Sequence, residues 1–341
     1  MTYGVKLLET EAVLAYSQCP RKAYLIHYTK NKGQPNEYLR IIEEKRKFTQ
    51  NEYIHNLKNI NEDIKIFNPN QLKNKTKYLT KANLISDNLC AVSDLLLRVK
   101  GRSSFGNYSY EPILFVGIHT ITKEDKLKLF FVGYVLGKYQ DNFPKYGRII
   151  NANHKSHKVN LDASIKIVTP IINAVHKLIE PPIIIMQKHC SICKYYHLCK
   201  TEAESVNSIS LLDRISPKLV KKYAEKGIFT VKQLSYCFKP RKRKKHKNKC
   251  PILFKPELQA LALRTNKIYI QELPEITNHP IKLFIDIEGI PDEKSYYLFG
   301  LIISIREKNT YQHFWADTIQ DEVNAWKNFT VNLKRYPEAP I

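Results

Sequence analysis

The sequence predicts an α/β protein. Strand-like apolar runs alternate with amphipathic segments of helical period, and one cysteine-bearing segment stands at each end of the first 200 or so residues. A late strand, IKLFIDIEG, starts a further domain at Ile281. With 341 residues, 43% of them hydrophobic, two or three domains with sizeable cores are expected. We place the domains at 1–204, 205–238 (a helical hairpin), 239–280 (a basic linker and connector) and 281–341.

The helices and strands of the first domain are predicted from the periodic spacing of its apolar residues. Residues 9–28 are expected to form one helix that carries Cys19, and a charged helix follows at 39–59. Two strands at 89–99 and 108–119 precede an amphipathic helix at 123–140. A last helix at 165–179 contains Pro170, which should lie near its start or at a kink.

Two later regions complete the pattern of predicted elements. Residues 209–234 read as helix, turn at Gly227, helix, which is typical both of hairpins that pack on a DNA backbone and of plain spacers. In the third domain, strands at 281–289, 296–305 and 310–316 precede a helix with apolar residues at helical spacing: Val323, Trp326, Phe329 and Leu333.

A basic run, KPRKRKKHKNK at 239–249, has eight Lys or Arg and no acid, so it is too charged to pack. It is either a phosphate-contacting loop or a mere linker. The candidate nucleic-acid contacts are Lys239, Arg241, Lys242, Arg243, Lys244 and Lys245.

Overall charge favours a polyanionic partner. Lys and Arg total 55 against 32 acids, a formal charge of +23, for which nucleic acid is the default partner. The alternative is a Lys-rich proteome bias, since Asn and Ile are abundant too. No apolar run reaches the ~18 residues that span a bilayer, and nothing at the N-terminus resembles a targeting peptide. We therefore expect a cytoplasmic protein without a membrane partner.

Four cysteines carry the strongest local signal. Cys190, Cys193 and Cys199 form C-x2-C-x5-C in HCSICKYYHLC, and Cys19 stands far away in CPRKAYL. A distant thiolate joined to a local trio suits an iron–sulfur cluster or a structural zinc, with His189 or His197 as alternative zinc ligands. Spare buried thiols are the remaining interpretation. The odd count of seven cysteines disfavours disulfides.

Asp286 and Glu288 form a carboxylate pair on the late strand. Period-2 geometry puts both on one face, about 6.6 to 7 Å apart along the strand. Carboxylates so placed can share divalent metal ions that clamp a phosphodiester. The alternative is a solvent-facing edge strand.

Taken together, the motifs resemble a family of bacterial and archaeal RecB-like nucleases. The matching segments are CPRKAYL, VSDLLLRV around Asp94, YEP at Tyr110–Pro112, KHCSICKYYHLC, KGIFTVKQL, LQALALRTNKIYI, FIDIEG and HFWAD. The resemblance covers nearly the whole chain. The cysteine layout is also similar to that of iron–sulfur exonucleases of CRISPR adaptation and RecB-type repair enzymes.

This resemblance implies a restriction-endonuclease-like mixed-sheet domain of the PD-(D/E)XK type, a helical hairpin and a ribonuclease H-like (DnaQ-like) exonuclease domain. It implies a 4Fe–4S cluster on Cys19, Cys190, Cys193 and Cys199, and a DNA substrate. Asp94 and Glu111 would bind Mg²⁺ or Mn²⁺ in the first domain, and Asp286 and Glu288 would do so in the last.

The sequence departs from the family pattern in both domains. An E-x-K motif would put lysine two residues after Glu111, where Ile113 stands, and Pro112 denies the strand a backbone donor. After Glu288 the chain supplies only Asp317 and Asp321, outside the expected later motifs. We expect a truncated third domain, with the remaining exonuclease portion, or a helicase, as a partner encoded downstream.

The leading hypothesis is a metal-dependent DNA nuclease, or the degenerate remnant of one, that acts in DNA repair or defence. The alternative is a non-catalytic nucleic-acid-binding protein that keeps the cluster, or zinc, as a structural staple. A zinc-stapled transcription-type regulator is a third hypothesis, disfavoured by the lack of a recognition helix.

Overall fold

The structure, a computed structural model, describes residues 6–239, 254–270, 277–290, 294–306 and 308–340. By their contacts, residues 1–269 form one compact unit and residues 270–341 another. The boundaries expected at 204 and 238 both fall inside the first unit.

The first unit is built on a seven-stranded mixed sheet, which confirms the α/β class. Its strand order is β2-β3-β4-β5-β6-β7, with β1 added beside the start of β4. Pairs β2–β3, β5–β6 and β1–β4 are parallel and the others antiparallel. The strands are β1 (Leu8–Glu9), β2 (Ile64–Ile66), β3 (Tyr78–Ser86), β4 (Leu89–Ser103), β5 (Gly106–Phe115), β6 (Tyr146–Ile150) and β7 (Ser156–Asn160).

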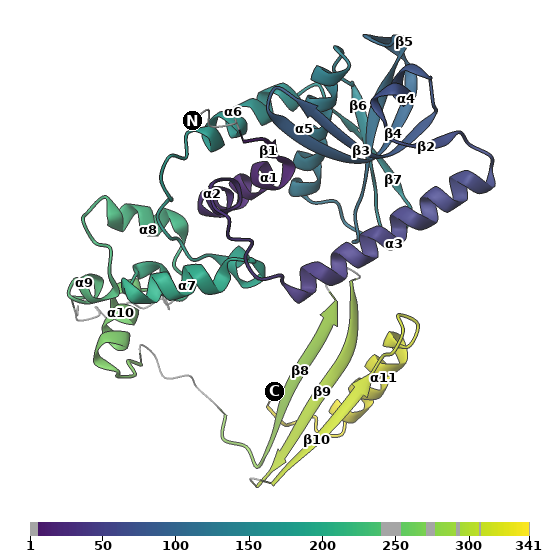
Figure 1. Cartoon of the computed structure of the whole chain (residues 1–341). Helices are drawn as coiled ribbons and strands as arrows, with labels where there is room; N and C mark the ends of the chain where they lie inside the picture. Colours follow the sequence, from purple (N-terminus) through teal and green to yellow (C-terminus); the bar gives the residue numbers. More distant parts are fainter. Residues whose placement is uncertain (1–5, 240–253, 271–276, 291–293, 307, 341) are drawn as a thin grey trace. The chain divides into compact units, whose positions relative to one another are not determined.

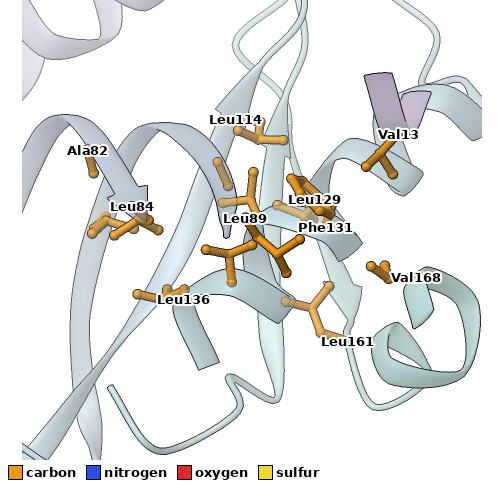
Figure 2. Packing of buried hydrophobic residues seen from close by; sticks show 14 of the residues in the cluster. Val13, Ala82, Leu84, Leu89, Leu114, Leu129, Phe131, Leu136, Leu161 and Val168 are labelled. Atoms are coloured by element: carbon orange, nitrogen blue, oxygen red, sulfur yellow. The ribbon is translucent and has the colours of Figure 1, made fainter. Parts of the chain in front are cut away.

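Helices cover the sheet on both faces, because each face is apolar (Figure 1). One face packs on α1 (Thr10–Gln18), α5 (Lys123–Tyr139) and α6 (Ser164–His176), through a core drawn in Figure 2. The other face packs on α3 (Glu37–Asn59), through a smaller cluster that includes Leu57, Leu95 and Phe115. A short α4 (Pro69–Lys73) links β2 to β3.

The helix expected over residues 9–28 is two helices, α1 and α2 (Pro20–Tyr28), broken at Cys19. Cys19 has extended backbone (φ −158°, ψ 114°) because the residue before proline is disfavoured in the α region. It closes α1 through its N–H, which donates to the Ala15 carbonyl, and opens α2 by accepting from the Ala23 N–H. The break therefore puts a cysteine at a helix junction.

Most other predicted elements of this unit are confirmed, with shifted ends. The helix expected at 39–59 begins at Glu37 because the Asn36 side chain caps it by accepting from the Leu39 N–H. Strands β1, β2, β3, β6 and β7 are not among the predicted elements. Pro170 lies inside α6. No helix in the described part of the chain is long and apolar enough to cross a membrane.

A helical module follows the sheet. It comprises η1 (Lys188–Ile192), α7 (Tyr196–Ser205), η2 (Ile209–Leu211), α8 (Pro217–Ala224), α9 (Val231–Ser235) and α10 (Pro256–Thr265). The expected hairpin is α8 and α9, and Gly227 between them has φ +74°, which favours glycine. Helix α10 lies where a linker was expected, starting at a proline and ending at left-handed Asn266. Its Ala260 is buried in the hairpin's own core.

The second unit is a three-stranded antiparallel sheet with one helix. The strand order is β10-β9-β8, from β8 (Ile281–Ile290), β9 (Ser295–Ile305) and β10 (Lys308–Trp315), and α11 (Glu322–Leu333) packs on one face. Leu283, Phe299 and Phe329 belong to this core. Three strands followed by a helix agree with the expected order of elements.

Gly117 offers a direct test of how α3 sits on the sheet. A Cβ there would lie 2.2 Å from the Ile42 carbonyl oxygen of α3, a backbone atom that cannot move aside cheaply. Gly117→Ala should therefore cost about 1 to 3 kcal/mol of unfolding free energy, measured by urea denaturation.

The matched control is Gly133→Ala in α5, whose added Cβ meets only the tip of the Leu161 side chain at 2.8 Å. There, yielding of the side chain and better helix propensity should keep the change within about 1 kcal/mol. Equal stability of both variants would contradict the packing of α3.

Candidate functional site

The four predicted cysteines converge on one pocket. Cys19 comes from the α1–α2 junction, Cys190 from η1, Cys193 from the end of η1 and Cys199 from α7, and all four line the pocket together with apolar side chains such as Leu25, Ile184 and Met186. Segments far apart in sequence thus supply a four-thiol donor set. Such a set suits an iron–sulfur cluster or zinc.

Cationic side chains surround these thiols. The Arg21 guanidinium hydrogen-bonds Cys199, donates to the Pro182 carbonyl and forms an ion pair with Glu202. Lys22 lies close enough to Cys193 for their charges to interact. A thiolate centre carries negative charge, so the two cations complement it.

Burial raises the pKa of the Cys190 and Cys199 thiols. Opposing this, the Gln187 N–H donates to the Cys190 Sγ at 3.3 Å, and Arg21 favours the thiolate of Cys199. Among the described residues, no group of three or more His, Cys, Asp or Glu side chains is arranged to hold a single metal ion.

Asp94 is buried on β4, and both of its carboxylate oxygens are occupied. Oδ2 accepts from the Phe115 N–H at 2.9 Å, and Oδ1 accepts from Arg46 Nη1 of α3 at 2.8 Å. Arg46 also forms a bidentate ion pair with Glu43, in which both hydrogen bonds are 2.7 Å long. Hydrogen bonding to Glu43, together with the charge of Asp94, raises the pKa of Arg46. A metal ion at Asp94 would have to compete with the positive charge of Arg46, which already neutralises the carboxylate.

The Glu111 and Asp94 carboxylates do not lie next to each other. The register that pairs Leu97 with Glu111 and Leu95 with Ile113 brings Asp94 to the level of Leu114. At about 3.3 Å per residue, the two acids are roughly 10 Å apart along the sheet. Burial raises the pKa of Glu111, while the charges of Arg148 and Lys158 oppose that rise.

Ile113, which stands where the E-x-K motif would place a lysine, belongs to the hydrophobic core. Ile113 is buried and packs with Leu95 and Phe115 in the cluster beneath α3. The position where the motif would place a lysine is therefore occupied by a buried apolar side chain.

A basic groove opens beside Asp94. It has a volume of about 580 Å³ between α3, β2, β3 and β4. Four exposed lysines line it, and among the residues that the structure describes none of them forms an ion pair: Lys47, Lys58, Lys65 and Lys81. Sequence reasoning missed this groove, although Lys47 and Lys58, eleven residues apart, lie on one face of α3.

Asp286 and Glu288 lie exposed on β8, opposite Gly300 and Leu298 of β9. They share the sheet face that α11 leaves uncovered. His313 of β10 pairs with Gly300 and so stands level with Asp286, two strands away. It lies in the HFWAD segment but had not been singled out.

Of the remaining candidate residues, some lie in the described part of the chain and others do not. Asp321 begins α11, and its carboxylate accepts from the Thr318 N–H and hydroxyl. Lys239 is exposed after α9. Residues 241–245, with the other candidate phosphate contacts, lie outside the described residues.

Comparisons with models of protein families and with curated proteins each found no match to this chain.

Proposed function

We propose that this chain is a nucleic-acid-binding protein with the architecture of a RecB-like nuclease domain. In this proposal the site around Asp94 binds nucleic acid and does not carry out metal-dependent cleavage. The observation that carries the proposal is the basic groove of Lys47, Lys58, Lys65 and Lys81 beside an Asp94 already neutralised by Arg46.

Electrostatics supports binding. Four exposed ammonium groups around one groove attract a polyanion, and each phosphate that they neutralise releases counterions. The formal charge of +23 adds a long-range attraction of the same sign. DNA is the partner that the family resemblance favours.

The same site argues against hydrolysis. Metal-assisted cleavage of a phosphodiester needs carboxylates that are free to bind metal. Asp94 has both oxygens occupied, and Glu111 stands at a different level of the sheet.

A second candidate function, a metal-dependent nuclease, rests on the other unit. Asp286 and Glu288 are exposed on one face of β8, so Mg²⁺ or Mn²⁺ can reach both carboxylates without displacing a partner side chain.

The thiol pocket has a structural role in this proposal. A 4Fe–4S cluster on Cys19, Cys190, Cys193 and Cys199, with zinc as the alternative, would tie the α1–α2 junction to the cysteine loop. A cluster spreads its thiolates more widely than one zinc ion, which holds sulfur at about 2.3 Å, and the thiols line a pocket without closing on one point. Binding such a centre contributes folding free energy.

The groove is tested by the salt dependence of DNA binding. Lys47→Ser/Lys81→Ser should weaken binding and lower the slope of log affinity against log salt by about 0.7 to 0.9 for each lost phosphate contact. Fluorescence anisotropy with a labelled oligonucleotide measures both. The control is Lys166→Ser/Lys177→Ser, which removes the same charge from exposed positions on α6. An identical slope in the two double variants would rule out the groove.

Catalysis is tested with single- and double-stranded DNA under Mg²⁺ or Mn²⁺. We expect no cleavage that Asp94→Ala or Glu111→Ala abolishes. Any chelator-sensitive cleavage should instead vanish in Asp286→Ala, because the exposed Asp286 and Glu288 carboxylates would hold the metal together. Robust cleavage lost in Asp94→Ala would show that Arg46 yields to metal and would refute the non-catalytic assignment.

The cluster is tested by metal content. Protein purified without oxygen should be brown from thiolate-to-iron charge transfer and contain about four irons per chain. Cys193→Ser should lose the iron and unfold at lower temperature, whereas Cys237→Ser, an exposed cysteine outside the pocket, should match the parent. Colourless protein with one zinc per chain would replace the iron assignment while keeping the site.

A further inference from the structure

A second large pocket lies within the helical module, between the cysteine loop (residues 186–193) and the residues that precede α8. Its volume is about 710 Å³, and its walls come from η1, α7, η2 and the segment that leads into α8. A pocket of this size can accommodate a nucleotide.

The pocket walls are cationic. Lys188, Lys200 and Arg214 line it, and Asp213 is the single acid among its described lining residues. Lys200 forms an exposed ion pair with Glu204 at 3.8 Å, which holds it weakly. Arg214 has left-handed backbone (φ +58°), an uncommon conformation for a residue with a long side chain.

An aromatic ring adds a second kind of contact. Tyr196 lines the same pocket, and Lys200 Nζ lies 5.8 Å from the centroid of its ring. A half-buried ring beside ammonium groups is the pairing that holds a nucleobase by stacking and its phosphate by charge.

The loop that carries Lys188 is held in place by contacts within the protein. The Gln187 side-chain amide donates to the Gln18 carbonyl at 2.9 Å, and the Cys190 N–H donates to the Gln187 carbonyl at 2.8 Å. The wall of the pocket is thus ordered before any ligand arrives, which lowers the entropic cost of binding.

We infer that this pocket binds a nucleoside phosphate, with Lys188, Lys200 and Arg214 on the phosphate and Tyr196 under the base. The phosphate comes either from a free nucleotide or from a polynucleotide. The polynucleotide case rests on the proposed function and adds a contact surface outside the basic groove.

Binding is measured with a labelled single strand of about 12 nucleotides, with AMP and with inorganic phosphate. Lys188→Ser/Arg214→Ser should weaken binding at least about tenfold, because the variant loses two charged hydrogen-bond donors to the phosphate. The control pair Lys166→Ser/Lys177→Ser should bind as the parent does. AMP binding that the variant loses assigns the free nucleotide, and loss with the oligonucleotide alone assigns the polymer.

Lysine acetylation read by mass spectrometry gives an independent measurement on the unmutated protein. Ligand should slow the modification of Lys188 and Lys200 and leave Lys166 and Lys177 unchanged. Equal affinity in the pocket and control variants, or no protection of Lys188 at saturating ligand, overturns the inference.

The groove variant Lys47→Ser/Lys81→Ser runs in the same assay. Weaker oligonucleotide binding in that variant alone refutes the polynucleotide case and leaves the proposed function standing, and if the pocket variant also binds AMP as the parent does, the pocket is refuted. The absence of any oligonucleotide binding by the parent refutes the proposed function, and AMP binding then tests the pocket by itself.

Discussion

The first unit depends on how one buried carboxylate is satisfied. A carboxylate cannot lose water without hydrogen bonds or an opposite charge, and Asp94 obtains both. The Phe115 N–H ties it to β5, and Arg46 ties it to α3. Helix α3 is thereby fixed on the sheet, and Gly117 lets its backbone come within contact distance. The groove of exposed lysines exists because α3 is held there.

A nuclease site and an ion-paired Asp94 use the same carboxylate differently. In the first case a divalent cation would neutralise the acid, and here the guanidinium of Arg46 does so from within the chain. Arg46 is itself held by Glu43, so its charge is anchored from two sides. With Asp94 paired to Arg46 and with Ile113 and Phe115 in the apolar cluster beneath α3, the electrostatics of this site favour the binding that we propose.

The four-thiol pocket and the larger cationic pocket share a wall. Met186, His189, Cys190 and Tyr196 line both. Whatever stabilises the thiol centre therefore also shapes the place where we propose a nucleoside phosphate binds. A ligand that favours one arrangement of this loop must favour the same arrangement at the thiols, because linkage between two sites is reciprocal.

Local patterns determined much of this protein. The α/β class, the span of α3 and α5, the hairpin turn at Gly227 and the strand with Asp286 and Glu288 all follow from periodicity and from Gly and Pro chemistry. The spacing of Cys190, Cys193 and Cys199 indicated a shared site, and CPRKAYL indicated its fourth member.

Only the tertiary structure decided the rest, because it depends on register and on packing between distant segments. The break of the first helix at Cys19 is an exception, because Pro20 is a local signal that periodicity alone does not register. The one-dimensional order of Asp94 and Glu111 suggested a pair, yet the β4–β5 register sets them at different levels. Arg46 reaches Asp94 across 48 residues of sequence, and no local pattern encodes such a contact. Charge composition indicated a polyanionic partner, but the placement of α3 against β2, β3 and β4 decided which lysines gather in one groove.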